Sequence, residues 1–586
     1  MTIRDYTEEA VRKYLRTAIL VDDQLFTSKS ENATGQEDGS AHDLSGVSDT
    51  SASARSGSVH AMESFKQFGE ALARNPLDDA PSPSTESFSP QKVVDGFYRL
   101  GIVCGLYEPK TSEFSNGAVP QRLVDLCDHS DVFILDWKLK NNKADSPVPA
   151  LIWQLLSRDE SCGEPRAVRF CAIYTDEALG TVFSKLHSEI KTRFPQRTAE
   201  EDVSSYRIHL KGLTIRLYRK TDATEAAGNP KRFVSSADLA ETIVQDFVSE
   251  YGGIVPATAL RSIAEVRDNA KRILEKFPKG MDPALVLHAG LTLKEKGIVS
   301  DITALLGDEM SSILADMELP PDELYDLCAE YVNSCEEGVF SRTNDKVFCG
   351  RATSSTIKEF LTEVFRQKTY SPCSGERNLD PVFKNCTDSK GNLCPSRGLL
   401  HVFQTFVENK TSEAKDYAFG ALSALFCQRT IYSKQKILRF GTVVRECLTE
   451  GTLLPSYYLC LMPSCDSVRL EGDGPHRFPF WKLDFVSEEG ETRTHGLYVK
   501  ADGKYFSLCA KGKIREKLHI MDFPSQQQVV RFDDAGTLVC ANGKDRLEWI
   551  AELKSAHMQR IAERVSREFS RVGLSESEWL RLQVGK

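Results

Sequence analysis

The stretch DVFILD at residues 131–136 decides the fold of the first half of this chain. Its central residues are all apolar, which suits a strand that is buried on both faces of a parallel sheet. The stretch ends in Asp136, so a carboxylate stands where the strand leaves the core. We therefore interpret residues 131–136 as a central strand with a reactive group at its carboxyl end.

Similar apolar runs alternate with segments of helical periodicity as far as about residue 250. The other expected strands are residues 17–21, 102–106, 167–174 and 213–218. The expected helices contain residues 93–100, 123–127, 147–156, 182–190 and 239–247. Ser89-Pro90 and Ser146-Pro147 are typical helix starts, with a capping side chain followed by proline. This alternation predicts an α/β fold with a doubly wound, five-stranded parallel sheet of the flavodoxin type.

An insertion at about residues 27–90 separates the first strand from its helix. Residues 27–59 contain no Ile, Met, Phe, Tyr or Trp and are rich in Ser, Gly and Asp. Such a composition buries too little apolar surface to offset the entropy of ordering. We expect the insertion to be disordered, apart from a short helix at residues 61–75.

Polar side chains stand at the carboxyl ends of the expected strands. Asp22 and Asp23 follow the first strand, Asp136 the third, Thr175 the fourth and Lys220 the fifth. These strand ends share the edge where such sheets bind ligands. Converging carboxylates repel one another unless a cation joins them, and hard oxygen ligands suit Mg²⁺. A hydroxyl and an ammonium group can hold phosphoryl oxygens, so we predict a phosphoryl-transfer site with a carboxylate nucleophile.

The order and type of these residues resemble the receiver domain of response regulators, and the segment DWKL at residues 136–139 is a good local match. The resemblance implies a partner histidine kinase as the phosphoryl donor. It also implies a role for each residue: metal-site acids at Asp22 and Asp23, phosphoacceptor at Asp136, a metal-binding main-chain carbonyl at Lys138, switch hydroxyl at Thr175 and phosphate-pairing lysine at Lys220.

The sequence departs from the receiver pattern around the fifth strand. Leu217 stands where receivers have an aromatic residue, Tyr218 comes one place late, and Thr221 replaces the usual proline. These departures put the usual signalling switch in question, though not phosphorylation. Each acid also has a structural interpretation, as a solvated turn or a loop cap, and Thr175 alone is also a plausible cap of the next helix.

We expect a receiver domain at residues 1–252, a helix-rich region at 253–450 and a C-terminal α+β region at 451–586. In the helix-rich region, one apolar face is expected to contain Ile263, Val266, Ala270 and Ile273, and further helices are expected at residues 357–365 and 399–448. The C-terminal region is expected to form strands at residues 457–463 and 478–485, a hairpin at 495–509 with its turn at Asp502-Gly503, and a helix at 545–568.

Three cysteines, Cys373, Cys386 and Cys394, lie in a loop-like segment. A zinc site there is conceivable, but the spacing lacks the paired CxxC of a zinc ribbon. The spacing leaves metal binding by these cysteines open.

Two further segments, LCLMPSCDSVRL (459–470) and SRVGLSESEWLRL (570–582), resemble stretches of large bacterial proteins that carry a divergent response receiver domain. Members of that group occur in phage-defence operons, including the phosphorelay-like Detocs systems, beside a sensor kinase and a toxic effector. The resemblance implies an effector partner from the same operon. Residues 465–467 are either a turn or a site, and Arg469 and Arg571 are either surface or interface residues.

The composition and the amino-terminal sequence disfavour a nucleic-acid-binding, an exported or a membrane protein. The chain has 74 basic and 84 acidic side chains and a formal charge of −10, which disfavours non-specific binding to nucleic acid. Asp5, Glu8 and Glu9 interrupt any signal peptide, and no apolar window is long enough to span a membrane. The 16 scattered cysteines are typical of reduced thiols. We expect a cytoplasmic protein.

The leading hypothesis is a signalling protein and not a turnover enzyme, either a switch or a sink that drains phosphoryl groups from another receiver. The alternative is an effector enzyme in the second half, controlled by the receiver. A phosphatase of the haloacid dehalogenase type is disfavoured, because it needs a second acid two residues after the nucleophile, where Lys138 stands. A DNA-binding regulator is disfavoured by the acidic charge and by the lack of a recognition motif.

Overall fold

The computed structural model shows two compact units, each described by itself below. One unit comprises Val11–Glu160 and Pro165–Glu250, and the other comprises Met1–Ala10, Ser161–Glu164 and Tyr251–Lys586. The structure describes residues 1–23, 25, 88–109, 119–139, 146–162, 168–194, 200–210, 212–220, 233–291, 298–317, 321–335, 355, 358, 359, 362, 365, 366, 412–431, 435–447, 455–467, 470–472, 474–486, 496–526 and 528–569.

Several predictions from the sequence concern residues outside these ranges. They are the disorder of the insertion between residues 27 and 87, its helix at 61–75, and the roles of Thr221, Cys373, Cys386, Cys394, Arg469 and Arg571. Most of residues 357–365 and residues 399–411 also lie outside the described ranges.

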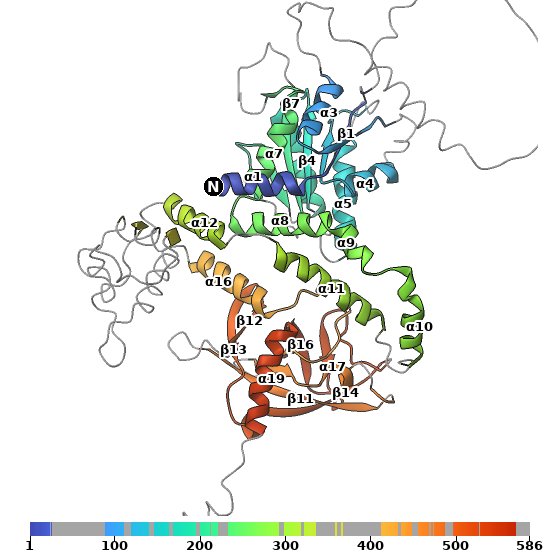
Figure 1. Cartoon of the computed structure of the whole chain (residues 1–586), viewed down its shortest axis with the longest axis vertical. Coiled ribbons are helices and arrows are strands. Elements are labelled where there is room, and N and C mark those ends of the chain that lie inside the picture. The colour runs from blue at the N-terminus through green and yellow to red at the C-terminus, as the bar shows by residue number, and fades with distance from the viewer. Residues whose placement is uncertain are drawn as a thin grey trace, which may run out of the picture. The chain divides into compact units, whose positions relative to one another are not determined.

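The first unit contains a sheet with the five predicted strands as its parallel core (Figure 1). In chain order these are β1 (Thr17–Val21), β2 (Val103–Tyr107), β3 (Val132–Leu135), β4 (Arg169–Thr175) and β7 (Leu213–Lys220). They lie side by side in the order β2-β1-β3-β4-β7, and every neighbouring pair is parallel. The predicted α/β class and parallel sheet are therefore confirmed.

The sheet is larger than the five strands that we predicted. A short hairpin, β5 (Glu200–Asp202) and β6 (Arg207–Leu210), joins the edge of β7 in the antiparallel sense. Two further residues, β8 (Phe233–Val234), pair with the end of β7. Strands β5, β6 and β8 are only three, four and two residues long. Although Ile208 and Leu210 of β6 are buried, alternation over so few residues does not identify a strand in the sequence.

Helices cover both faces of this sheet. They are α3 (Pro90–Arg99), α4 (Gln121–Asp128), α5 (Val148–Cys162, in this unit as far as Glu160), α6 (Leu179–Arg193) and α7 (Leu239–Glu250). Helix α1 (Ile3–Tyr14) belongs to this unit only from Val11 on. The start of α3 is as predicted, since the Ser89 hydroxyl accepts a hydrogen bond from the Lys92 N–H at 3.4 Å. Helix α1 was missed, although Tyr6, Ala10 and Tyr14 give it a buried stripe at helical spacing.

Alternate residues of the strands form two separate parts of the core. On one face, Phe133, Ile173 and Ile215 pack with apolar residues of α4, α5 and α6. On the other face, Phe170 packs against Phe247 of α7, with ring centroids 5.9 Å apart. Because both faces are covered, the strands read as continuous apolar runs in the sequence.

A buried ion-pair network fastens the amino edge of the sheet. Arg169, at the start of β4, is 1% exposed. Its guanidinium Nη1 lies 3.1 Å from Asp128 Oδ1 at the end of α4, and Nη2 pairs with the buried Asp159 of α5. The network thus connects a strand to two helices on one face of the sheet.

From Tyr251 on, the second unit contains helices α8 (Ile254–Asp268), α9 (Ala270–Glu275), α10 (Asp282–Leu291), α11 (Ile298–Asp316) and α12 (Pro321–Ser334), with the short 3₁₀ turn Lys279–Met281 before α10. The helical character of this stretch is as predicted, but its predicted apolar face is wrong. Ile263 is 50% exposed, and α8 instead buries Ala257, Leu260 and Ala264. The helix ends at Asp268, so a periodicity that continues across residues 269 and 270 does not describe one helix face.

The rest of the second unit contains an antiparallel sheet. Its strands are β9 (Thr442–Glu446), β10 (Tyr457–Cys460), β11 (Pro475–Phe485), β12 (Gly496–Ala501), β13 (Lys504–Cys509), β14 (Leu518–Pro524), β15 (Thr537–Val539) and β16 (Arg546–Glu552), in the order β12-β13-β11-β10-β9-β16-β15 with β14 paired to β11. Its helices are α16 (Ser412–Cys427), α17 (Ser464–Ser467), α18 (Ile514–Lys517) and α19 (Ser555–Phe569).

The predicted hairpin is confirmed, with Ala501 paired to Lys504 and positive φ angles at Asp502 and Gly503. Two predicted helical stretches are wrong in part, because residues 442–446 and 546–552 are the paired strands β9 and β16. Apolar residues fill both faces of the sheet, and that tertiary burial outweighs local helical spacing. Residues 465–467 lie in the single turn α17, where Asp466 is exposed.

None of the helices within the described ranges combines the length and the apolar content that crossing a membrane requires.

We predict that Arg169→Met lowers the stability of the full-length protein by about 3–5 kcal/mol, because Asp159 stays buried without its cation. Arg158→Met is the matched control, since the half-exposed Arg158 also pairs with Asp128 and its loss should cost about 1 kcal/mol or less. Thermal unfolding followed by circular dichroism checks both. Equal shifts in the two variants would contradict the burial argument.

We also predict that Gly420→Ala destabilises the second unit. A Cβ at this position of α16 would overlap the Tyr505 side chain, so the helix would have to move away from β13. Overpacking of this kind typically costs about 1–3 kcal/mol. Gly290→Ala in α10 is the control, because no atom lies within 4 Å of its added Cβ. It should be neutral or stabilising in the same unfolding experiment.

Candidate functional site

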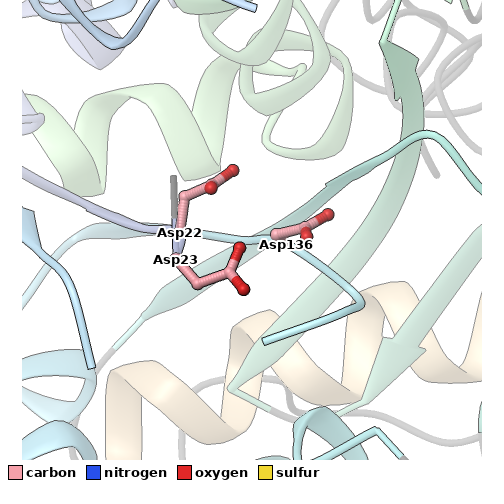
Figure 2. Close-up of side chains that lie close together, drawn as sticks. All are labelled: Asp22, Asp23 and Asp136. Atoms are coloured by element: carbon pink, nitrogen blue, oxygen red, sulfur yellow. The ribbon is translucent and has the colours of Figure 1, made fainter. Parts of the chain in front are cut away.

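Three carboxylates meet at the carboxyl edge of the parallel sheet. Asp22 and Asp23 follow β1, and Asp136 follows the neighbouring strand β3. Each offers an oxygen within 4.8 Å of the others (Figure 2). Their exposed fractions are 1%, 7% and 8%, so these acids are not a solvated turn.

The register of the sheet explains this convergence. Val21 of β1 pairs with Leu135 of β3, so the residues that follow each strand emerge at the same level. The Asp136 N–H donates to the Val21 carbonyl at 3.0 Å, which extends the ladder by one bond beyond β3. The backbone therefore holds Asp136 beside the acidic pair.

Lys220, the last residue of β7, brings a positive charge to the carboxylates. Its Nζ donates to Asp22 Oδ2 at 2.9 Å and lies 3.5 Å from Asp136 Oδ1. Strand β4 stands between β3 and β7, so the long lysine side chain extends across the end of β4. Lys220 is 7% exposed, and the structure places its ammonium beside Asp22 and Asp136. Its role as the phosphate-pairing lysine stays a prediction.

Thr175 ends β4 at the same edge of the sheet. It pairs with Arg219 in the ladder, one residue before Lys220, and is 1% exposed. Its hydroxyl accepts a hydrogen bond from the Glu177 N–H at 3.3 Å. The capping contact is therefore present, and the role of Thr175 as a switch hydroxyl remains a prediction.

Lys138 follows Asp136 by two residues, and its side chain pairs with Glu177. The ammonium forms an ion pair with Glu177, which raises the pKa of Lys138, and the side chain is 74% exposed. Only the main-chain carbonyl of Lys138 was predicted to bind metal, and that ligand role stays a prediction.

The buried charges shift the acid–base behaviour of the site. Burial raises the pKa of Asp136 to about 7, and the charges of Asp22 and Asp23 act in the same direction against the opposing charge of Lys220. Burial alone would lower the pKa of Lys220, but attraction to Asp136 and Asp22 outweighs it and raises that pKa. In the part of the chain that the structure describes, the Lys220 ammonium thus lies against two of the three carboxylates in a poorly solvated place.

This set of donors fits a small divalent cation. The carboxylate oxygens are hard ligands, they come from rigid strand ends, and together they carry more negative charge than Lys220 balances. Mg²⁺ prefers such oxygen ligands and retains positions for water or phosphate oxygens.

Sequence reasoning missed two aromatic residues of this site. The Lys220 Nζ lies 4.2 Å from the ring centroid of Phe88 and 5.7 Å from that of Tyr174. Phe88 is far from every strand end in the sequence, so no motif indicated it. Tyr174 directly precedes Thr175, and its place on the same strand end was the available signal.

The departures at β7 are visible in the structure. Leu217 lies in the apolar cluster with α4, α5 and α6, while the Tyr218 hydroxyl donates to Asp246 Oδ2 of α7 at 2.6 Å. The Tyr218 hydroxyl is thus hydrogen-bonded to a side chain of α7.

Residues 14–225 match the model of the response receiver domain family. This part of the chain is a response receiver domain, and the match includes Asp22, Asp23, Asp136, Thr175 and Lys220. The matched range stops before the segments 459–470 and 570–582. No curated protein and no solved structure matches the chain.

We predict that Asp136→Asn stabilises the metal-free protein in a pH-dependent way. The pKa of Asp136 is about 7 in the folded protein against an ordinary value of 3.8, so the folded state loses stability as this carboxyl ionises. The variant should be more stable by roughly 2–4 kcal/mol at pH 8, and the difference should disappear as the pH falls toward 4.

Thermal unfolding between pH 4 and 8 in the presence of a chelator measures this difference. Asp176→Asn is the control, because that acid is exposed and next to the same edge. A difference that does not change with pH would contradict the assignment of a buried, raised pKa to Asp136.

Proposed function

Because residues 14–225 form a response receiver domain, we propose that Asp136 accepts a phosphoryl group from a phosphohistidine of a partner kinase. The observation that carries this proposal is the buried cluster of Asp22, Asp23 and Asp136 with Lys220 at the sheet edge. The three carboxylates and the main-chain carbonyl of Lys138 would hold a bound Mg²⁺.

In the proposed step, a carboxylate oxygen of Asp136 attacks phosphorus, and an oxygen–phosphorus bond forms. The nitrogen–phosphorus bond of the phosphohistidine breaks, its electron pair returns to the imidazole nitrogen, and that nitrogen takes up a proton from water. When bound, Mg²⁺ supplies positive charge that reduces repulsion between the acids and the incoming phosphoryl oxygens.

The other residues hold the phosphoryl group in place. Lys220 already lies between Asp22 and Asp136, so its ammonium pairs with a phosphoryl oxygen when the group arrives. The Thr175 hydroxyl, at the end of the intervening strand, donates to another oxygen. Preorganised donors of this kind stabilise charge because they need little reorganisation during the reaction.

The proposed output is signalling and not turnover of a substrate. Phosphorylation of Asp136 changes contacts of the receiver with the rest of the chain or with an effector from the same operon. Draining phosphoryl groups from another receiver is the variant of this proposal. The likeness of residues 459–470 and 570–582 to phage-defence proteins supports a role in antiviral phosphorelay signalling in the cytoplasm.

We predict that the full-length protein forms an acid-stable, base-labile adduct with radiolabelled acetyl phosphate and Mg²⁺, and that Asp136→Ala abolishes it. Asp22→Asn should slow labelling by at least about tenfold, since it removes the negative charge of a proposed metal ligand that also accepts a hydrogen bond from Lys220. Asp176→Ala is the matched control and should be labelled normally. Labelling of Asp136→Ala at the wild-type rate would show that another residue is the acceptor.

A further inference from the structure

The surroundings of the Lys220 ammonium include an aromatic ring that comes from outside the strand ends. The Nζ lies 4.2 Å from the ring centroid of Phe88, well within the range of about 6 Å where a ring attracts a cation. The same nitrogen donates to Asp22 at 2.9 Å. The Phe88 ring and a proposed metal ligand therefore contact one ammonium group.

The backbone next to Phe88 is held in place by the residue that follows it. The next residue, Ser89, is the N-cap of α3, and its N–H donates to the Ser236 hydroxyl at 3.1 Å. Ser236 lies before α7 and is 8% exposed. The start of α3 is thus fastened to the segment that follows β8.

A second ring holds the Phe88 side chain. The rings of Phe88 and Tyr174 meet edge to face, with centroids 5.9 Å apart. Tyr174 is 2% exposed, and its hydroxyl donates to the Val234 carbonyl at 2.9 Å. Tyr174 is therefore fixed at both ends, and Phe88 rests against a rigid neighbour.

We propose that Phe88 is a positioning residue, which holds the Lys220 ammonium on the carboxylates for phosphoryl transfer to Asp136. This inference rests on the proposed function. A ring face attracts an ammonium group without taking one of its N–H donors in an ordinary hydrogen bond. The three donors of Lys220 thus stay available to Asp22, Asp136 and a phosphoryl oxygen.

The chemistry of lysine explains why such a neighbour matters. Its ammonium sits on a flexible four-carbon side chain, so the charge has many alternative positions. Replacing Phe88 with leucine keeps apolar bulk but removes the ring face. The ammonium then spends less time where the phosphoryl oxygen arrives, which slows transfer without removing any charge from the site.

The test is a double-mutant cycle on the full-length protein, with acetyl phosphate and saturating Mg²⁺. We expect Phe88→Leu to slow labelling of Asp136 by about 3- to 30-fold, the range that cation–π energies allow. Phe88→Tyr retains a ring and should restore most of the rate. In the Lys220→Met background, Phe88→Leu should have no further effect, because the cation is already absent.

A nearby pair provides the matched control. Arg219, the residue before Lys220, lies over the ring of Phe233 at 5.4 Å. Phe233→Leu removes a ring–cation contact of the same kind beside the site and should leave the labelling rate unchanged. Thermal unfolding midpoints show whether each variant is folded.

The outcomes separate this inference from the proposed function. If wild type is labelled on Asp136 but Phe88→Leu slows labelling equally in the wild-type and Lys220→Met backgrounds, the positioning role is overturned. Equal slowing by Phe233→Leu, or no rescue by Phe88→Tyr, overturns it too. Absence of label from the wild-type protein overturns the proposed function itself, and the positioning role falls with it.

Discussion

The arrangement of the receiver depends on the burial of like charges at one sheet edge. Asp22, Asp23 and Asp136 are each at least nine-tenths buried, and Lys220 is the cation that contacts two of them. Buried charges are tolerated only when partners compensate for lost hydration. The proposed Mg²⁺ would reduce the repulsion among these carboxylates.

The sheet supplies the geometry that this cluster needs. Neighbouring strands β1 and β3 place the acids side by side, and the order β3-β4-β7 sets Thr175 between Asp136 and Lys220. At the opposite edge, Arg169 joins β4 to α4 through the partly exposed Asp128 and to α5 through the buried Asp159. Both edges of the sheet therefore contain buried charged side chains: an arginine with two acids at the amino edge, and three acids with a lysine at the carboxyl edge.

The aromatic rings that approach the site do not come from β7, the strand that contains Lys220. Tyr218 on β7 donates to Asp246 of α7, and the rings that approach Lys220 belong to Phe88 and Tyr174. Lys220 therefore contacts Phe88 before the start of α3, and Tyr174 contacts Val234 in the segment before α7. The second unit has its own sheet with apolar clusters on both faces, one including Trp481 and the other Phe478.

The sequence by itself determined the parallel strands and the types of residue at their ends. Long apolar runs that end in acids, a hydroxyl residue and a lysine are local features, and strand ends of a parallel sheet must meet. It did not reveal the hairpin β5–β6, the strands β9 and β16, or the buried face of α8. Those depend on distant partners: β9 pairs with β16 across about a hundred residues, and burial overrides local helical spacing. Only the tertiary structure decided that Phe88 contacts Lys220, because more than a hundred residues separate them in the chain and no local pattern records a contact made across a folded sheet.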